Sequence, residues 1–403
     1  PPSARSRRCS LSCMNETQNT QPTEDVQPAV KSKAYRTIIA APMAGGPSSP
    51  ALVDAVAAHG GLGFLAAGYK TPEAVEKELD DIAQRARQRG AEPFYGLNLF
   101  VPQPSPSGED RDRAAAYRDE LAKDYKRFGV VEPELNWTTD DQWEGKLAVI
   151  RRRLDQREQR GEGHADGNNH AENVSVPDVL SFTFGLPPEK LVDEFQSRGI
   201  EVWATVATTH AAQVAAERGV AAVVVQGPEA GGHRATTTPD EEPGSEPLMC
   251  LVQAVSDLFS TTDEASTRPA IIAAGGIATP DHVGEALRHG ADAVAVGTIF
   301  AATEEAGTNE SYKQALISAT TDDTVITRAY SGRSARGRRD AFIDAHPDAP
   351  SVYPAVNGLT SPIRKTATKH GQTDSMSLWA GQSVEYAQGG PAGRLGLLNL
   401  QGR

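Results

Sequence analysis

Eight short apolar runs recur along the chain, and most are followed by a segment with a helical repeat. The runs are continuous rather than alternating in hydrophobicity, which is typical of strands buried on both faces. Gly199, Gly219 and Gly290 each follow a helical segment, where a left-handed helix cap favours glycine. The predicted strands lie at 37–42, 62–66, 94–101, 178–184, 201–206, 221–226, 270–274 and 293–297, and the predicted helices at 49–59, 72–89, 188–198, 209–218, 246–259 and 280–289.

Strands that alternate with helices in this way predict a parallel sheet, and hence the α/β class. Eight such units in about 270 residues fit a closed (β/α)8 barrel, the TIM barrel. An open, doubly wound sheet is the alternative, but the regular spacing of the units favours closure.

The regular alternation breaks once, between the third and fourth predicted strands. The insertion at 102–176 opens with three prolines and then reads as helical over 109–128 and 139–159. We expect it to form a helical lobe over the barrel mouth. The predicted division is a disordered leader at 1–33, a barrel at 34–309 that includes the insertion, and a C-terminal helical segment at 310–403 that completes the lobe.

Composition excludes several classes of partner. The 403 residues include 40 Lys and Arg against 53 Asp and Glu, a formal net charge of −13. This charge argues against nucleic acid and against an anionic membrane surface, and no run approaches the ~18–20 apolar residues of a membrane span. Three cysteines give no disulfide framework, so we expect a cytoplasmic protein. Cys9 and Cys13 have no histidine nearby, so we expect no metal site.

In such a barrel the functional residues lie at the carboxyl ends of the strands. The first predicted strand runs into Pro42 and a glycine pair, which let the backbone lie close to a flat ligand. The third carries Asn98, a polar amide in an apolar run. Asn98 is either a satisfied core amide or a ligand contact at the barrel mouth.

Glycines also follow the last two predicted strands. Gly275 and Gly276 come after the seventh strand, and Gly297 and Thr298 come after the eighth. Backbone amides at these two places form the usual phosphate site of such barrels, so we predict a phosphate-bearing ligand. No GxGxxG motif follows a predicted strand, so the sequence shows no obvious binding motif for NADH.

The sixth predicted strand leads into "VVVQGPEAGGHRATT" at 223–237. Gln226 ends the strand, and Gly231 and Gly232 allow close approach to a cofactor ring. His233 then projects over that ring. A free imidazole has a pKa of about 6.5, so it can accept a proton near neutrality or face an anion. A loop histidine with a structural hydrogen bond is the alternative interpretation.

Several segments together resemble the nitronate monooxygenase family, formerly called 2-nitropropane dioxygenases. They are "QGPEAGGHR" (226–234), "AAGGI" (273–277), "VGT" (296–298), "APMAGG" (41–46), "GLNLF" (96–100), "FTFGLP" (182–187), "SGRSARG" (331–337) and "LWAGQS" (378–383). The resemblance covers about residues 36–390. It implies a TIM barrel that binds FMN non-covalently and oxidises alkyl nitronates of the propionate 3-nitronate type with O2. The resemblance further implies a reaction through a flavin semiquinone that gives a carbonyl product and nitrite or nitrate, and thus a role in detoxification.

The resemblance also carries roles onto individual residues. His233 corresponds to the catalytic histidine, either as a base on a neutral nitroalkane or as a donor to the nitronate anion. The corresponding cofactor contacts are Pro42, Met43, Asn98, Gln226, Gly231, Gly232, Gly275, Gly276, Ala295, Val296, Gly297 and Thr298. The substrate-pocket candidates are Tyr330, Arg336, Trp379 and Gln382.

Three further features bear on substrate and assembly. Ala235 stands where the family usually has glycine, and an acidic, threonine-rich loop follows at 236–246, so substrate access differs. Arg333, Arg336, Arg338 and Arg339 form a basic cluster that we expect to be mostly solvated or ion-paired, with one arginine drawing the nitronate inward. The expected partners are a small nitronate and O2, in a monomer or homodimer.

Two other functions remain open. An NADH-dependent flavin reductase of a quinone or an enoyl thioester shares the barrel and the EAGGH-type loop. The "SGRSARG" and "LWAGQS" segments favour the oxygenase over this reductase. An FMN carrier without activity is the third hypothesis, and the intact His233 argues against it.

Overall fold

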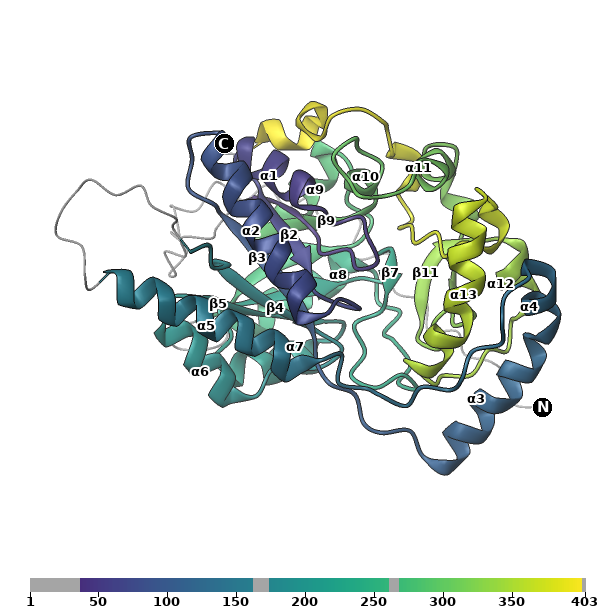
Figure 1. The fold of residues 1–403 in the computed structure, drawn as a ribbon. Helices are drawn as coiled ribbons and strands as arrows, with labels where there is room; N and C mark the ends of the chain where they lie inside the picture. The colour runs from purple at the N-terminus through teal and green to yellow at the C-terminus, as the bar shows by residue number, and fades with distance from the viewer. Residues whose placement is uncertain (1–36, 162–173, 261–267, 401–403) are drawn as a thin grey trace, which may run out of the picture.

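Eight parallel strands close into a barrel in the order β1-β2-β3-β4-β5-β6-β8-β9 (Figure 1). The computed structural model describes residues 37–161, 174–260 and 268–400, so the predicted leader at 1–33 lies outside the described residues. The closed barrel confirms the predicted fold class. Its strands are β1 (Ile38–Ala40), β2 (Leu62–Ala66), β3 (Tyr95–Phe100), β4 (Val179–Thr183), β5 (Glu201–Val206), β6 (Ala222–Gln226), β8 (Ala270–Ala274) and β9 (Ala293–Val296).

The helices around the barrel begin and end within two residues of their predicted positions. Ser49, Thr71, Thr208 and Thr279 each accept a hydrogen bond from the N–H three residues on, which satisfies the first turn. Such caps are worth about 1 kcal/mol each. The helices are α1 (Pro50–Ala58), α2 (Pro72–Gln88), α6 (Glu189–Ser197), α7 (Thr209–Glu217), α8 (Leu248–Ser260) and α9 (Pro280–Arg288).

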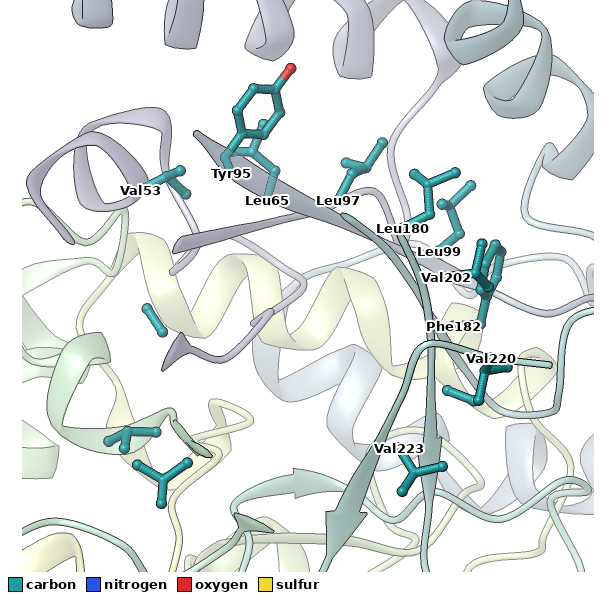
Figure 2. Close-up of a cluster of buried hydrophobic side chains, with 14 of the residues drawn as sticks. Val53, Leu65, Tyr95, Leu97, Leu99, Leu180, Phe182, Val202, Val220 and Val223 are labelled. Carbon is teal, nitrogen blue, oxygen red and sulfur yellow. The ribbon is translucent and has the colours of Figure 1, made fainter. Parts of the chain in front are cut away.

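The barrel strands bury both faces, as their continuous apolar runs predict. Leu65, Leu97, Leu180 and Val202 pair in register across four strands and face the surrounding helices (Figure 2). The alternate positions face the barrel interior, which Phe64 and other apolar side chains fill toward the amino ends of the strands. Burying each such side chain is worth about 1.5–3 kcal/mol, so this two-sided core fixes the register of the strands.

The insertion between β3 and β4 divides between two cores. Its first helices, α3 (Gly108–Glu120) and α4 (Ala122–Phe128), pack against α13 (Ala355–Lys369) in the lobe. Its last helix, α5 (Trp143–Gly161), packs on α2 and joins the barrel core through Leu147. Figure 1 shows α3 and α4 beside α13, well away from α5. The expectation that the whole insertion forms the lobe is therefore wrong for α5, because its apolar face matches the barrel wall.

The lobe contains a small antiparallel sheet that the sequence did not predict. Its order is β10 (Thr324–Thr327), β11 (Ala335–Arg338) and β7 (Gly232–His233). Because β7 belongs to the loop after β6, the lobe pairs directly with a loop of the barrel. The remaining helices are α10 (Thr298–Ala301), α11 (Glu310–Ile317) and α12 (Ala341–Ala345), with 3-10 turns at Thr321–Asp323, Thr373–Ser375, Val384–Tyr386, Ala392–Arg394 and Gly396–Leu400.

The end of the described chain returns to the barrel. Ala392, Leu397 and Leu398 are buried in the same apolar core as the barrel strands. The turn at Gly396–Leu400 lies against α9 and β1, and Figure 1 places the C-terminal segment near α1. The predicted lobe segment at 310–403 thus contributes residues 392–398 to the barrel core.

Candidate active site

A cavity of about 800 Å³ opens at the carboxyl ends of the barrel strands and is covered by the lobe. This volume lies within the roughly 300–1,000 Å³ of typical ligand pockets. Among the residues predicted from the sequence, those that line the cavity are Pro42, Met43, Asn98, Gln226, Gly231, Gly232, His233, Gly275, Gly276, Ala295, Gly297, Thr298 and Trp379.

Two predicted contacts lie close to the cavity without lining it. Val296 faces the outer helices, because side chains alternate along β9 and its neighbour Ala295 takes the inward position. Gln382 lies between two residues that do line the cavity, Gly381 and Ser383. Its backbone N–H donates to the carbonyl of Glu229, so residue 382 holds the loop after β6.

Two predicted substrate residues are buried elsewhere. Tyr330 is fully buried in the lobe, where it stacks on Phe342 and its hydroxyl donates to Asp340 Oδ2 at 2.7 Å. Arg336 is also buried, and its Nε donates to the carbonyl of Pro228 at 2.8 Å. The expectation that the arginine cluster is solvated or ion-paired is wrong for Arg336, because its guanidinium supports the loop after β6.

Glycines form one wall of the cavity, and we call Gly231, Gly275, Gly276 and Gly297 the glycine cradle. A Cβ at Gly231 would lie 2.5 Å from the backbone nitrogen of Gly381, and one at Gly275 would lie 2.9 Å from that of Ala230. Gly275 and Gly276 also have φ values of +126° and +65°, which side-chain-bearing residues rarely adopt. The cradle therefore brings bare backbone against the cavity at the ends of β6, β8 and β9.

Two side-chain hydroxyls hold the glycine cradle in place through hydrogen bonds. The Ser383 hydroxyl donates to the carbonyl of Gly276 at 2.6 Å, and the N–H of Gly381 donates to Thr298 Oγ1 at 2.9 Å. The "LWAGQS" segment thus ties the loops after β8 and β9 together. Hydrogen bonds within the protein leave the backbone amides of these loops pre-positioned for a ligand.

Asn98 lies on the inward face of β3 and is buried. Its amide nitrogen donates to the side chains of Ser181 and Thr183 at 2.8 and 3.0 Å. Among the described residues, none donates to its Oδ1. Asn98 is thus held as a core amide on one side, and it can still accept from a ligand in the cavity that it lines.

Backbone pairing and one side chain fix the position of His233. Gly232, at φ +77°, turns the chain so that His233 pairs with Ala335 of β11. Gln226 then donates to the carbonyl of His233 at 3.0 Å and accepts from the N–H of Ala235 at 2.9 Å. Gln226, predicted as a cofactor contact, therefore also clamps the histidine loop from both sides.

The imidazole of His233 lies among aromatic rings and faces one hydroxyl. Its Nε2 is 2.9 Å from Ser331 Oγ, and the rings of Phe184, Tyr353 and Trp379 surround it at centroid distances of 5.3–6.0 Å. Burial, together with the nearby charges of two arginines, lowers the pKa of His233 to about 3. The imidazole is therefore neutral at physiological pH.

Those two arginines are Arg333 and Arg364. Arg333 is fully buried, lies 4.2 Å from the ring centroid of Phe184 and donates to Thr236 Oγ1 at 2.8 Å. The prediction that Arg333 is solvated or ion-paired is wrong, because aromatic faces and neutral oxygens hold its charge. Arg364 comes from α13 and lines the cavity.

Sequence reasoning missed several side chains that line the cavity. Tyr69, Tyr312 and Arg364 lie outside the predicted strands, so their positions depend on how the loops and the lobe pack. Phe184 and Thr205 lie within the fourth and fifth predicted strands, whose pattern does not show which positions face the cavity. The motif "FTFGLP" did contain Phe184, whose φ of +71° is rare for an aromatic residue. The missed residues are Tyr69, Phe184, Thr205, Tyr312 and Arg364.

The described residues contain no group of three or more His, Cys, Asp or Glu side chains able to hold a metal ion. Within the same residues, no helix combines the length and apolarity needed to span a membrane. A parallel barrel with a glycine cradle after its last strands and a neutral histidine in the same cavity is typical of barrel enzymes that bind a phosphate-bearing ligand.

Comparison with known proteins places the chain more closely. The family model described as nitronate monooxygenase matches residues 28–395. The chain belongs to this family and is a flavin-dependent oxidoreductase.

Individual relatives agree with this membership. The chain is 31% identical to a probable nitronate monooxygenase of Bacillus subtilis (strain 168), over 87% of this chain and 90% of that protein. It is 32% identical to one of Staphylococcus haemolyticus, over 87% and 89%. A nitroalkane oxidase from Streptomyces ansochromogenes superposes with a TM-score of 0.76 at 34% identity, over 90% of this chain and 94% of that one. FabK from Thermotoga maritima, with a TM-score of 0.62 at 23% identity over 90% and 91%, shares the fold.

Proposed function

We propose that the protein oxidises alkyl nitronates with O2, using non-covalently bound FMN and giving a carbonyl product and nitrite or nitrate. The observation that carries this proposal is the placement of His233 in the same cavity as the glycine cradle. Family membership supports the reaction class, and the cavity supports the cofactor class. We also propose a cytoplasmic enzyme that acts as a monomer or homodimer.

The residues of the cavity fit FMN. The cradle and Thr298 would hold its phosphate, because bare N–H groups and a hydroxyl at this place suit an anion. Pro42, Met43 and Ala295 would flank the flat ring, and the free Oδ1 of Asn98 would accept from a ring N–H. When bound, the flavin supplies the electron-accepting and oxygen-activating chemistry of the reaction.

The protein side chains would position the substrate. Phe184, Tyr353 and Trp379 make an apolar enclosure that excludes water from around His233. Ser331 holds Nε2 of the imidazole, so the ring cannot turn away from the cavity. We infer that His233 acts as a neutral hydrogen-bonding group toward the nitronate, not as a base, because a pKa of about 3 makes it a weak proton acceptor.

This inference predicts a specific pH dependence. An ordinary histidine gains a proton as pH falls through about 6.5, whereas His233 stays neutral down to about pH 3. Oxygen uptake with a preformed nitronate should therefore show no change in kcat/KM attributable to a histidine between pH 6 and 9, and the neutral nitroalkane should be turned over poorly. Efficient turnover of the nitroalkane that rises with an apparent pKa of 6–7 would contradict the inference.

The likeness to FabK is compatible with the reductase alternative, but no residue of the cavity favours that function. FabK is 23% identical to this chain, and a likeness at this level shows a shared fold only. The 34% identity to a nitroalkane oxidase and the match to the nitronate monooxygenase family favour the oxygenase. The two functions differ in whether NADH is required, which makes them separable by experiment.

A further inference from the structure

The guanidinium of Arg364 lines the cavity, and its hydrogen-bond partners among the described residues all lie on its own helix. Its Nε donates to Thr360 Oγ1 at 3.1 Å, and its Nη2 donates to the carbonyl and Oδ1 of Asn357 at 2.8 and 2.9 Å. Among the described residues, Nη1 donates to no atom. Nε and Nη2 are thus held on α13, and among the described residues Nη1 is left to donate into the cavity.

The charge of Arg364 has no counterion within the described part of the chain. No Asp or Glu there forms an ion pair with it, whereas Arg151 and Arg268 each hold a carboxylate, of Glu194 and Asp292. Burial lowers the pKa of Arg364, and the ionisable neighbours that oppose this are Tyr69 and Tyr330. Because an unpaired cation is costly to bury, an anion entering the cavity would be stabilised here.

Other cations make the same region electropositive. Arg333 lies behind Phe184, and Lys365, the next residue of α13, lines the cavity from an exposed position. The guanidinium of Arg333 already donates hydrogen bonds to Thr236 and Gln103. Of the two guanidiniums, Arg364 is therefore the better placed to bind a ligand. The glycine cradle lies at the ends of the barrel strands, whereas Arg364 belongs to the lobe. We therefore expect the cradle to contact the cofactor and Arg364 to contact the substrate.

We propose that Arg364 binds an oxyanion of the substrate through its Nη1. This proposal rests on the proposed function and adds a binding residue on the lobe side of the cavity. A guanidinium held in place donates a charge-assisted hydrogen bond to an anionic oxygen and brings its charge to the anion. A nitronate group and a carboxylate elsewhere on the same substrate share this chemistry, and the experiment separates them.

The test uses the flavin-loaded Arg364→Gln variant of the full chain. Binding of propionate, an inert planar anion, is followed by the change in flavin absorbance. Then kcat/KM is measured for propionate 3-nitronate and for propyl-1-nitronate, which has no carboxylate. Lys369→Gln is the matched control, because it removes the same charge from an exposed position at the end of α13. Arg364→Lys keeps the charge without the fixed guanidinium and serves if the Gln variant folds poorly.

We expect Arg364→Gln to weaken propionate binding by about 10- to 100-fold, the usual range for a hydrogen bond to a charged group. A loss of kcat/KM for both nitronates would show that Arg364 binds the nitronate group, and a loss confined to propionate 3-nitronate would show that it binds the carboxylate. Either result supports the proposal, and Arg364→Lys should fall between wild type and Gln.

Three outcomes overturn the proposal. They are unchanged propionate binding and kcat/KM in Arg364→Gln, an equal effect of Lys369→Gln, and loss of bound flavin from Arg364→Gln, which would place the residue in the cofactor site. If the wild-type protein oxidises neither nitronate, the proposed function fails, but the propionate titration still decides whether Arg364 binds an oxyanion.

Discussion

Replacing His233 with alanine is expected to lower kcat/KM for a nitronate by about 10²- to 10⁴-fold, the range for losing a positioned catalytic group. The imidazole is held by β7–β11 pairing, by Gln226 and by Ser331, so its placement is rigid and its loss leaves the substrate without that contact. Flavin content should stay near the wild-type value, because the glycine cradle does not depend on the imidazole. Oxygen uptake and the flavin spectrum are the measurements.

The matched control for this variant is His210→Ala. His210 is exposed in the first turn of α7, on the outside of the barrel, so its removal should leave kcat/KM within error of the wild-type value. Turnover by His233→Ala at the wild-type rate would remove the histidine from the mechanism.

The second large effect is expected at the glycine cradle. Gly276→Val places a β-branched residue at φ +65°, with its Cβ 3.0 Å from the Cβ of Glu229, so the loop must move. Overpacking of this kind costs about 1–3 kcal/mol, which corresponds to about 5- to 150-fold weaker flavin binding. The variant should purify colourless, whereas the wild-type protein should be yellow and release FMN on heating.

A gentler variant separates loss of cofactor from loss of fold. Gly297 has no left-handed φ, and a Cβ there would meet nothing nearer than the sulfur of Met43 at 3.7 Å. Gly297→Ala should therefore fold normally and lose flavin only because its methyl group occupies ligand space. Gly284→Ala, on α9 with open space around it, is the control and should stay yellow and be about 0.5–1 kcal/mol more stable. Retention of full flavin in Gly276→Val and Gly297→Ala would mean that the phosphate lies elsewhere.

The barrel could be predicted from sequence because its strands are buried on both faces. Continuous apolar runs mark such strands, and the glycines that follow β8 and β9 mark the ends that face a ligand. The same two-sided burial explains why the sequence analysis placed Val296 at the cofactor although its side chain faces the outer helices. In "AVAVG" both faces carry apolar residues, so the pattern does not reveal which positions point inward.

The lobe could not be predicted in the same detail, because its contacts depend on tertiary packing. The segments of α3 and α5 both read only as helical in the sequence, and the elements they pack against decide that one joins the lobe and the other the barrel. The strand β7 is two residues long and carries no alternation. Arg364 lies on α13, whose packing against α3 and α4 sets which of its faces turns inward, so its place in the cavity could not be predicted from the sequence.

The most direct test of the proposed function is oxygen uptake by the purified yellow protein with propionate 3-nitronate in air, without NADH. The cradle, the neutral His233 and the unpaired Arg364 predict rapid uptake that needs no external reductant. No uptake from a flavin-loaded sample, together with flavin reduction by NADH in the absence of oxygen, would contradict the nitronate oxygenase and support the reductase.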